Sequence, residues 1–119
     1  MDDTETIAFA LRLVPGGEAE YRRRHDALWP ELHEALLASG ILRYEIHLEP
    51  ATNLLFAHIV RRKAHAMDAL RQSDVMGRWR THMADLLIGD ADGPERVELR
   101  RMFRLVSPDA AKGLKLRND

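Results

Sequence analysis

The sequence predicts a single α+β domain of the split βαβ type, also called ferredoxin-like, with the element order β-α-β-β-α-β. Four segments alternate apolar and polar residues with a period of two, which is typical of half-buried strands, and other segments repeat apolar residues at helical spacing. The length of 119 residues suits one domain, because domains usually hold ~100–150 residues. We expect this domain to cover residues 1–105 and a polar C-terminal extension to cover residues 106–119.

The first strand and the first helical region are predicted from the N-terminal third of the chain. Apolar side chains alternate over residues 6–13, and the Pro-Gly-Gly run at 15–17 ends this strand. One helical face over residues 18–39 then carries five residues at steps of three and four, which are Tyr21, His25, Leu28, Leu32 and Leu36. Pro30 lacks the amide hydrogen that a helix interior uses, so we expect a break near Trp29 and a second helical piece that begins at Pro30.

The rest of the domain is predicted to hold a hairpin, two helices and a last strand. In order, these are strands over 41–49 and 54–62, helices over 64–72 and 74–87, a loop over 89–94 and an alternating strand over 97–105. Either Ser73 or Asp74 is a suitable N-cap for the longer helix.

The predicted architecture leaves one face of the sheet uncovered. Helices cover only one face of such a four-stranded sheet, and so short a chain has little left for the other face. We therefore expect a second copy of the chain to cover it, which predicts a homodimer. The alternative is a monomer whose outer sheet face is solvated.

Composition excludes several classes of function. The 18 basic and 19 acidic residues nearly cancel, and no basic stripe is present, so we expect no nucleic-acid partner. No apolar run reaches the ~18–20 residues that cross a bilayer, and the acidic opening at 1–5 is unlike a secretion signal. We expect no membrane partner and a cytoplasmic location. The absence of cysteine excludes thiol nucleophiles, disulfides and thiolate metal sites.

A tyrosine and a histidine on one helical face are the strongest catalytic candidates. Tyr21 and His25 are four residues apart, so both side chains should lean toward the sheet. An imidazole titrates near neutrality and can both give and take protons in a pocket. Tyr44, on the apolar face of its strand, and Trp79 are expected to line the same cavity. For His25 the alternative is a core histidine bonded to a backbone carbonyl, and for Trp79 it is an ordinary core residue.

Motifs for metals and cofactors are missing from the sequence. The other five histidines show no H-E-x-x-H spacing, so we expect no metal site. No glycine-rich phosphate loop and no G-x-S-x-G run occur, so we expect no cofactor and no acyl-transfer chemistry. The basic run at 22–24 is expected to form a solvated helix face.

Four blocks of sequence resemble the L-rhamnose mutarotase family. In order, they are E-Y-R-R-R-H-D-A-L-W-P-E-L at 20–32, Y-E-I-H-L at 44–48, N-L-L-F-A at 53–57 and D-V-M-G-R-W-R-T-H-M-A-D at 74–85. The resemblance spans residues 7–105 and implies a dimeric α/β-barrel that interconverts the α and β anomers of L-rhamnose without a cofactor. It also implies that His25 is catalytic and that Tyr21, Tyr44 and Trp79 contact the sugar.

Two departures from the family bear on the substrate. The family usually carries tandem tryptophans where this chain has Trp79-Arg80, so Arg80 either contacts the sugar in place of an aromatic ring or folds outward. The loop at 89–94 reads G-D-A-D-G-P where the family shows an N-P-D-N-S-P-like run. Because loops on a rigid scaffold often decide substrate preference, we expect L-rhamnose or a related 6-deoxy aldose.

The chemistry of mutarotation suits an imidazole. Ring opening removes a proton from the anomeric hydroxyl and delivers one to the ring oxygen. We assign the delivery to His25, with Tyr21 positioning the sugar hydroxyls, and the removal to a water or a second side chain. Two other functions fit the same fold, namely a cofactor-free oxygenase or isomerase and a non-catalytic sugar-binding dimer module.

Overall fold

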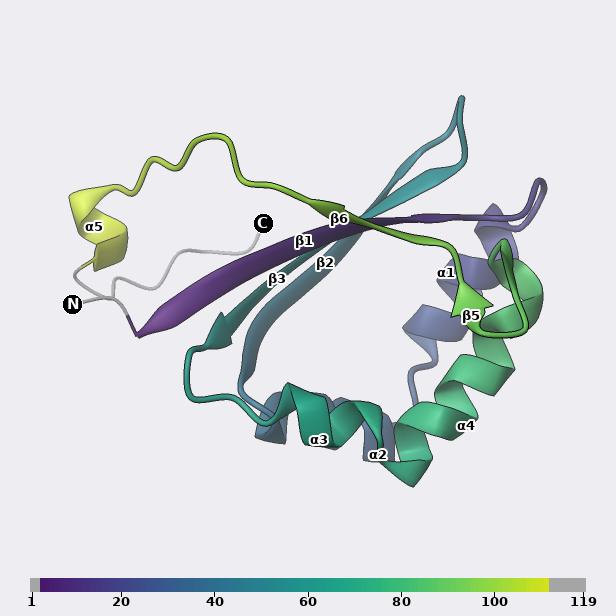
Figure 1. The fold of residues 1–119 in the computed structure, drawn as a ribbon, viewed down its shortest axis with the longest axis horizontal. Coiled ribbons are helices and arrows are strands. Elements are labelled where there is room, and N and C mark those ends of the chain that lie inside the picture. Colours follow the sequence, from purple (N-terminus) through teal and green to yellow (C-terminus); the bar gives the residue numbers. More distant parts are fainter. Residues whose placement is uncertain (1–2, 112–119) are drawn as a thin grey trace.

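The structure, a computed structural model, describes residues 3–111 and confirms the predicted order of strands and helices (Figure 1). Short extra elements occur in the 89–94 loop and near the C-terminus. The elements are β1 Thr4–Arg12, α1 Glu18–Asp26, α2 Pro30–Ala38, β2 Ile41–Glu49, β3 Leu54–Arg62, α3 Met67–Arg71, α4 Asp74–Met83, the 3-10 helix η1 Ala84–Leu86, β4 Gly89–Asp90, β5 Gly93–Pro94, β6 Arg96–Leu99 and α5 Pro108–Ala111.

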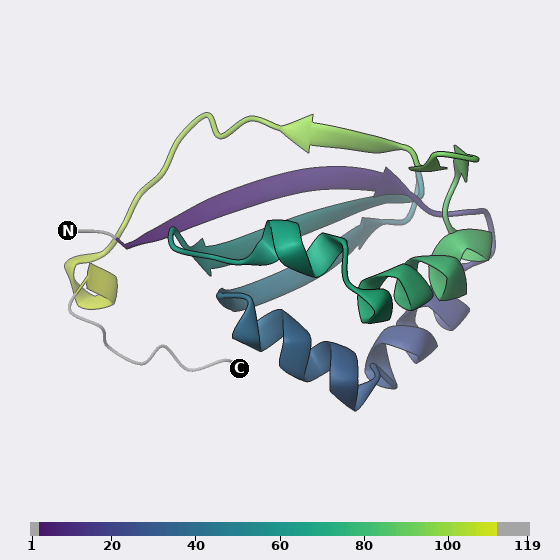
Figure 2. The ribbon, with the colours of Figure 1, turned by 60° about the horizontal axis from the view of Figure 1, so that its bottom comes forward.

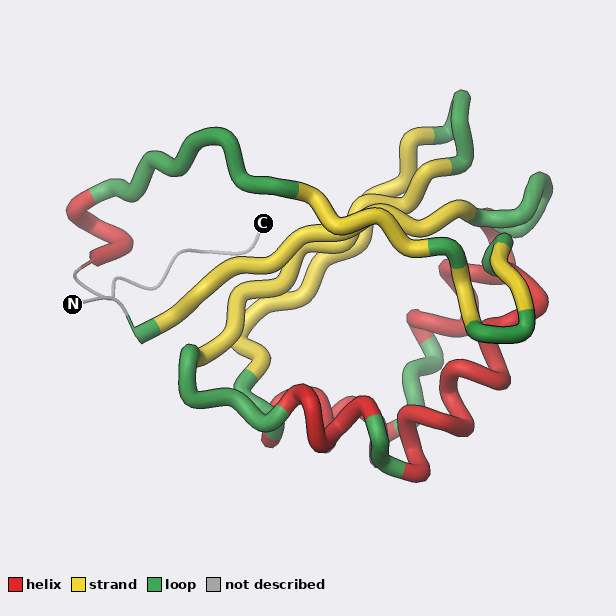
Figure 3. The backbone as a smooth tube through the Cα atoms, in the orientation of Figure 1, coloured by secondary structure: helices red, strands yellow, loops and turns green. Residues whose placement is uncertain are grey.

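Four of the strands form one antiparallel sheet in the spatial order β2-β3-β1-β6 (Figure 3). β1 pairs with β3 along its whole length, with Phe9 opposite Ala57 and Leu11 opposite Leu55. Counted along the chain, these strands are the second, third, first and fourth, which is the split βαβ topology that the sequence predicts. Strand β2 is an outer strand of the sheet.

The helices α1 to α4 lie on one side of the sheet (Figure 2). Alternate residues of β1 and β3 face this helical layer, because successive side chains of a strand point to opposite faces. The least exposed side chains come from both layers, since Ile59 is 2% exposed and Leu13 and Leu32 are each 1% exposed. The core therefore sits between the helices and one face of the sheet, as predicted.

Local signals in the sequence set the helix ends. Pro30 is the first residue of α2, and Trp29 before it is extended, with φ −60° and ψ 132°, so the predicted break is confirmed. Ser73 caps α4, and its hydroxyl accepts a hydrogen bond from the Met76 amide at 3.3 Å. The predicted helix over 64–72 is shorter than expected, because α3 begins only at Met67.

The predicted last strand is wrong beyond Leu99. β6 pairs with β1 over four residues only, and the chain then continues in an extended form away from the sheet (Figure 1). Met102, Phe103 and Leu105 are between 80% and 88% exposed in this segment. Their alternation is that of a strand, but β6 diverges from β1, so the segment lies beside no other strand in the part of the chain that the structure describes.

The loop predicted over 89–94 forms a tight hairpin, in which the short strands β4 and β5 pair on either side of a two-residue turn. A side chain at Gly89 would collide with the carbonyl of Gly93, which itself has a φ of 129°, so both positions favour glycine. Among residues 3–111, no helix has the length and apolar character needed to span a membrane. The cytoplasmic location stays a prediction.

Candidate active site

A large open cavity of about 1410 Å³ lies between the sheet and the helices. The residues that the sequence singled out come from α1, β2 and α4, and all of them line this cavity: Tyr21, His25, Tyr44, Trp79 and Arg80. The structure thus brings together side chains that are up to 59 positions apart in the chain, namely Tyr21 and Arg80.

The His25 imidazole is half-buried and oriented by its own helix. Its Nδ1 lies 3.0 Å from the carbonyl oxygen of Tyr21, one turn earlier in α1. A carbonyl only accepts, so Nδ1 carries the hydrogen and the Nε2 of the neutral ring keeps its lone pair. Burial lowers the pKa of His25 below 6.5, against a smaller opposing effect of this hydrogen bond. The result is a neutral imidazole with an accepting nitrogen on the cavity wall.

Two phenols accompany this imidazole. The Tyr21 ring stacks on the His25 ring, with 4.4 Å between centroids and 29° between planes. Burial raises the pKa of Tyr21, and Tyr44 raises it further, which indicates that the two hydroxyls are neighbours. Partial loss of water around the hydroxyl also raises the pKa of Tyr44, although the residue as a whole is 40% exposed, while Arg96 opposes this shift. Both phenols therefore keep their protons in neutral solution and can donate hydrogen bonds.

Trp79 is both a core residue and a cavity-lining residue, which were the two alternatives predicted for it. Its side chain belongs to the core, at 9% exposed, and it also lines the cavity. Its ring meets His25 edge to face, with 5.4 Å between centroids. The rings of Trp29 and His82 also contact the Trp79 ring, with 5.1 and 5.4 Å between centroids, and sequence reasoning selected neither residue. The Trp-Pro step at the helix break was the available signal for Trp29.

Five arginines line the cavity, and two of them, Arg80 and Arg96, are placed by further contacts. Arg80 is exposed and lies along the wall beside Gly77, so it is available to a ligand. Arg96, which sequence reasoning also missed, lines the cavity with its guanidinium 3.7 Å from the centroid of the Phe9 ring. This stacked arrangement is a typical cation–π contact.

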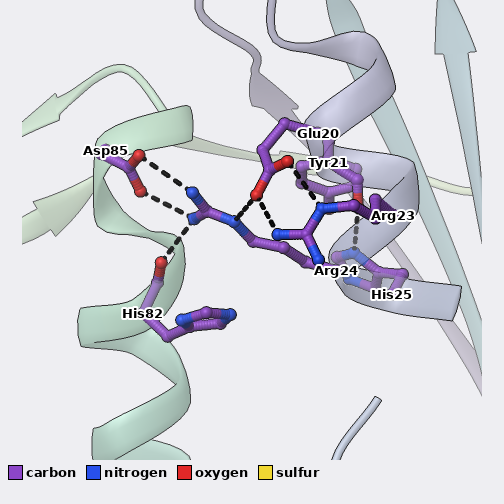
Figure 4. Close-up of polar contacts among 7 residues, drawn as sticks. All are labelled: Glu20, Tyr21, Arg23, Arg24, His25, His82 and Asp85. Atoms are coloured by element: carbon purple, nitrogen blue, oxygen red, sulfur yellow. Dashed lines mark hydrogen bonds and ion pairs between the residues drawn. The ribbon is translucent and has the colours of Figure 1, made fainter. Parts of the chain in front are cut away.

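An ion-pair network links the helix of His25 to the end of α4 (Figure 4). Arg24 bonds to the carboxylates of Glu20 and Asp85, at 2.7 and 2.8 Å. The basic run was predicted to be solvated. This is correct for Arg22, whose side chain is 83% exposed, and wrong for Arg24, whose side chain is 13% exposed. The reason is that the acidic partner Asp85 lies 61 positions away in the chain.

The network predicts a loss of stability in acid. Hydrogen bonds from Arg23 and Arg24 lower the pKa of Glu20 from 4.5 to about 2, so the unfolded chain binds this proton first. The stabilisation is complete above pH 4.5 and is lost as the pH falls through about 2. Urea unfolding should show a stability difference between the natural chain and Glu20→Gln that shrinks steadily over this range. A difference that does not change with pH would contradict the prediction.

The part of the chain that the structure describes holds no cluster of metal-ligand side chains. Within residues 3–111, no group of three or more histidine, aspartate or glutamate side chains is placed to hold a metal ion. The groups that line the cavity include three imidazoles, two phenols, an indole, five guanidinium groups and four carboxylates.

Comparison with known proteins gives a consistent family. The profile of the L-rhamnose mutarotase family matches residues 6–105. A protein of Burkholderia orbicola (strain MC0-3) named L-rhamnose mutarotase is 51% identical over 102 residues, which are 85% of this chain and 98% of that protein.

Solved structures extend the comparison to three dimensions. The crystal structure of an L-rhamnose mutarotase from Formosa agariphila has a TM-score of 0.77 at 31% identity and covers 86% of this chain and 99% of that one. A structure from Bordetella bronchiseptica, named for antibiotic biosynthesis monooxygenases, has a TM-score of 0.62 at 16% identity over 86% of this chain and 100% of that one, and shows a shared fold alone. From the profile match and the Burkholderia relative, this chain belongs to the L-rhamnose mutarotase family.

Proposed function

We propose that this chain is an L-rhamnose mutarotase, an isomerase of the aldose 1-epimerase type that interconverts the α and β anomers of L-rhamnose or a closely related 6-deoxy aldose. The observation that carries the proposal is the neutral His25 imidazole, which is stacked on the Tyr21 phenol and presents an accepting nitrogen at the cavity. The 51% identical Burkholderia relative, named L-rhamnose mutarotase, supports the choice of sugar.

The orientation of the imidazole suggests the order of proton transfers. Nε2 of His25 accepts the proton of the anomeric hydroxyl and then delivers it to the ring oxygen as the bond from that oxygen to C1 breaks. Both oxygens are attached to C1, so a single nitrogen can reach them in turn. Rotation about the C1–C2 bond and the reverse transfers close the ring as the other anomer. The sequence predicts only that His25 acts as the acid, and it assigns the anomeric proton to a water or a second side chain. Because the lowered pKa of His25 keeps the ring neutral, we assign that first step to His25 as well.

The other candidates bind the sugar rather than transfer protons in this scheme. Tyr21 and Tyr44 stay protonated because their pKa values are raised, so their hydroxyls donate hydrogen bonds to sugar oxygens. Trp79 offers an apolar wall for the pyranose, and Arg80 offers a donor on the same helix. No cofactor is needed for these steps.

We further propose that the enzyme is a homodimer. Apolar side chains are exposed on the outer sheet face, where Val97 is 55% and Leu99 is 40% exposed, and they continue into Phe103 and Leu105. An extended segment that alternates in this way can add to the outer strand of a second copy, which would bury these side chains.

The dimer is tested by sedimentation equilibrium at micromolar concentrations. We expect the natural chain to sediment at twice its 13.6 kDa mass, and Phe103→Ser combined with Leu105→Ser to shift the population toward the monomer. Leu37→Ser is the matched control, because Leu37 is an exposed leucine of α2 on the helical side, at 54%. A monomeric natural chain, or an unchanged dimer in the double variant, would contradict the proposal.

The activity is tested by magnetisation-transfer NMR on equilibrated L-rhamnose with catalytic amounts of protein. We expect exchange between the two anomeric signals to be accelerated far above the buffer rate. L-mannose, which differs from L-rhamnose only in its 6-hydroxyl, isolates the contribution of the 6-methyl group, and L-fucose and D-glucose in parallel samples test whether other stereochemistries are accepted. Exchange at the buffer rate for every sugar would overturn the proposal.

A further inference from the structure

Arg24 directly links the two helices that hold the site. Its Nη1 donates to the carbonyl oxygen of His82 at 2.6 Å and to the Asp85 carboxylate at 2.8 Å, and its Nη2 donates to the same carboxylate at 3.1 Å. Its Nε donates to Glu20, one turn earlier in α1, at 2.7 Å. All four interactions are visible in Figure 4.

The link is built from groups that suit one another chemically. The His82 carbonyl is among the last four of α4, which have no partner within a regular helix, and the C-terminal end of a helix favours a cation. Asp85 receives the two ends of the planar guanidinium, a paired geometry that lysine cannot reproduce. Glu20 holds the other side of the same side chain, so the guanidinium has little freedom to turn.

The link lies next to the proposed catalytic pair. Arg24 precedes His25 in α1, and the carbonyl it contacts belongs to the residue three positions after Trp79 in α4. The bonds therefore connect the two helices within one turn of the His25 and Trp79 rings, which are 5.4 Å apart.

We propose that Arg24 is a positioning residue for the reaction, which holds α1 against the end of α4 and so sets the spacing between the His25 imidazole and the Trp79 ring. The kinetic consequence rests on the proposed mutarotase function, whereas the geometric consequence does not. Arg23 offers a natural contrast, because it bonds to Glu20 within α1 and its side chain is 66% exposed.

The test compares Arg24→Gln and Asp85→Asn with the control Arg23→Gln. Nuclear Overhauser effects between the imidazole protons of His25 and the indole protons of Trp79 report the spacing without any sugar. Anomer exchange at several L-rhamnose concentrations gives kcat and KM separately. Thermal unfolding confirms that each variant is folded, and Asp85→Asn, which keeps the arginine, serves if Arg24→Gln does not fold.

We expect Arg24→Gln to weaken these Overhauser effects and to lower kcat by about 10–100-fold, as misplacement of a reacting group by about 1 Å can do, with KM changed about twofold or less. Asp85→Asn should act in the same direction, and the double variant should lose little more, because both changes remove one link. Arg24→Lys should restore only part of kcat.

Three results would overturn the proposal. The first is Overhauser effects in Arg24→Gln that match those of the natural chain. The second is a kcat of Arg24→Lys equal to that of the natural chain, and the third is a loss of kcat in Arg23→Gln as large as in Arg24→Gln. A natural chain that does not accelerate exchange would instead refute the proposed function, and the Overhauser comparison would still decide whether Arg24 sets the spacing.

Discussion

Replacing His25 by glutamine is expected to lower kcat for anomer exchange by about 10²–10⁴-fold, the usual contribution of a general acid/base. Glutamine occupies a similar volume and can accept a hydrogen bond, but it cannot carry the proton from one sugar oxygen to the other. KM should change little, because Tyr21, Tyr44 and Trp79 still line the cavity. Magnetisation transfer at several L-rhamnose concentrations measures both constants.

His58→Gln is the matched control for this variant. His58 is an exposed histidine of β3 whose neighbours Ala57 and Ile59 face the helical layer, so its own side chain points to the opposite face of the sheet. Its replacement should leave kcat at the natural value, with sedimentation equilibrium showing that the variant keeps the dimer, because this is the sheet face proposed to meet the second copy. A His25→Gln variant with natural kcat would remove the imidazole from the mechanism.

The pH dependence of the natural enzyme provides a second check on His25. The proposed first step needs the neutral ring, and burial lowers the pKa of His25 below its ordinary value of 6.5. The value of kcat/KM should therefore be constant near neutrality and fall as the pH drops through a pKa below 6.5. A profile that falls above pH 6.5, or that rises in acid, would contradict the role as a base.

Features with a local cause could be predicted from the sequence. The break before Pro30 follows from the missing amide of proline, and the start of α4 follows from the capping hydroxyl of Ser73. Likewise, the spacing of Tyr21 and His25 places both on one helical face whatever the rest of the chain does. These predictions depend on chemistry within about one turn of the residue concerned.

Features that depend on distant partners could not be predicted in this way. Whether Arg24 is solvated depends on Asp85, and nothing in the run at 22–24 signals that partner. The alternation over 97–105 predicts a strand, but it does not indicate which strand lies beside each residue. The end of pairing with β1 at Leu99 could therefore not be predicted. A pattern shows which face a residue occupies, and only the fold shows what covers that face.

Replacing Trp79 by alanine is expected to lower the free energy of unfolding by about 3–5 kcal/mol, the usual cost of removing a buried large aromatic side chain. The ring is 9% exposed and packs in one core cluster with Leu13, Leu32 and Met83, so its loss leaves a cavity that the rigid sheet cannot fill. Urea unfolding followed by circular dichroism measures the change. Leu37→Ala, at an exposed position of α2, should change the same free energy by roughly 0.5 kcal/mol or less.

A conservative variant separates the structural contribution of Trp79 from its contribution to sugar binding. Trp79→Phe keeps an aromatic ring in the core and should restore most of the stability, but the smaller ring shortens the wall that meets the His25 imidazole edge to face. If Trp79 also contacts the pyranose, Trp79→Phe should raise KM at nearly natural stability, because an apolar contact made equally in the ground and transition states affects binding alone. An alanine variant with natural stability and a raised KM would instead show that the ring serves the sugar and that the core does not depend on it.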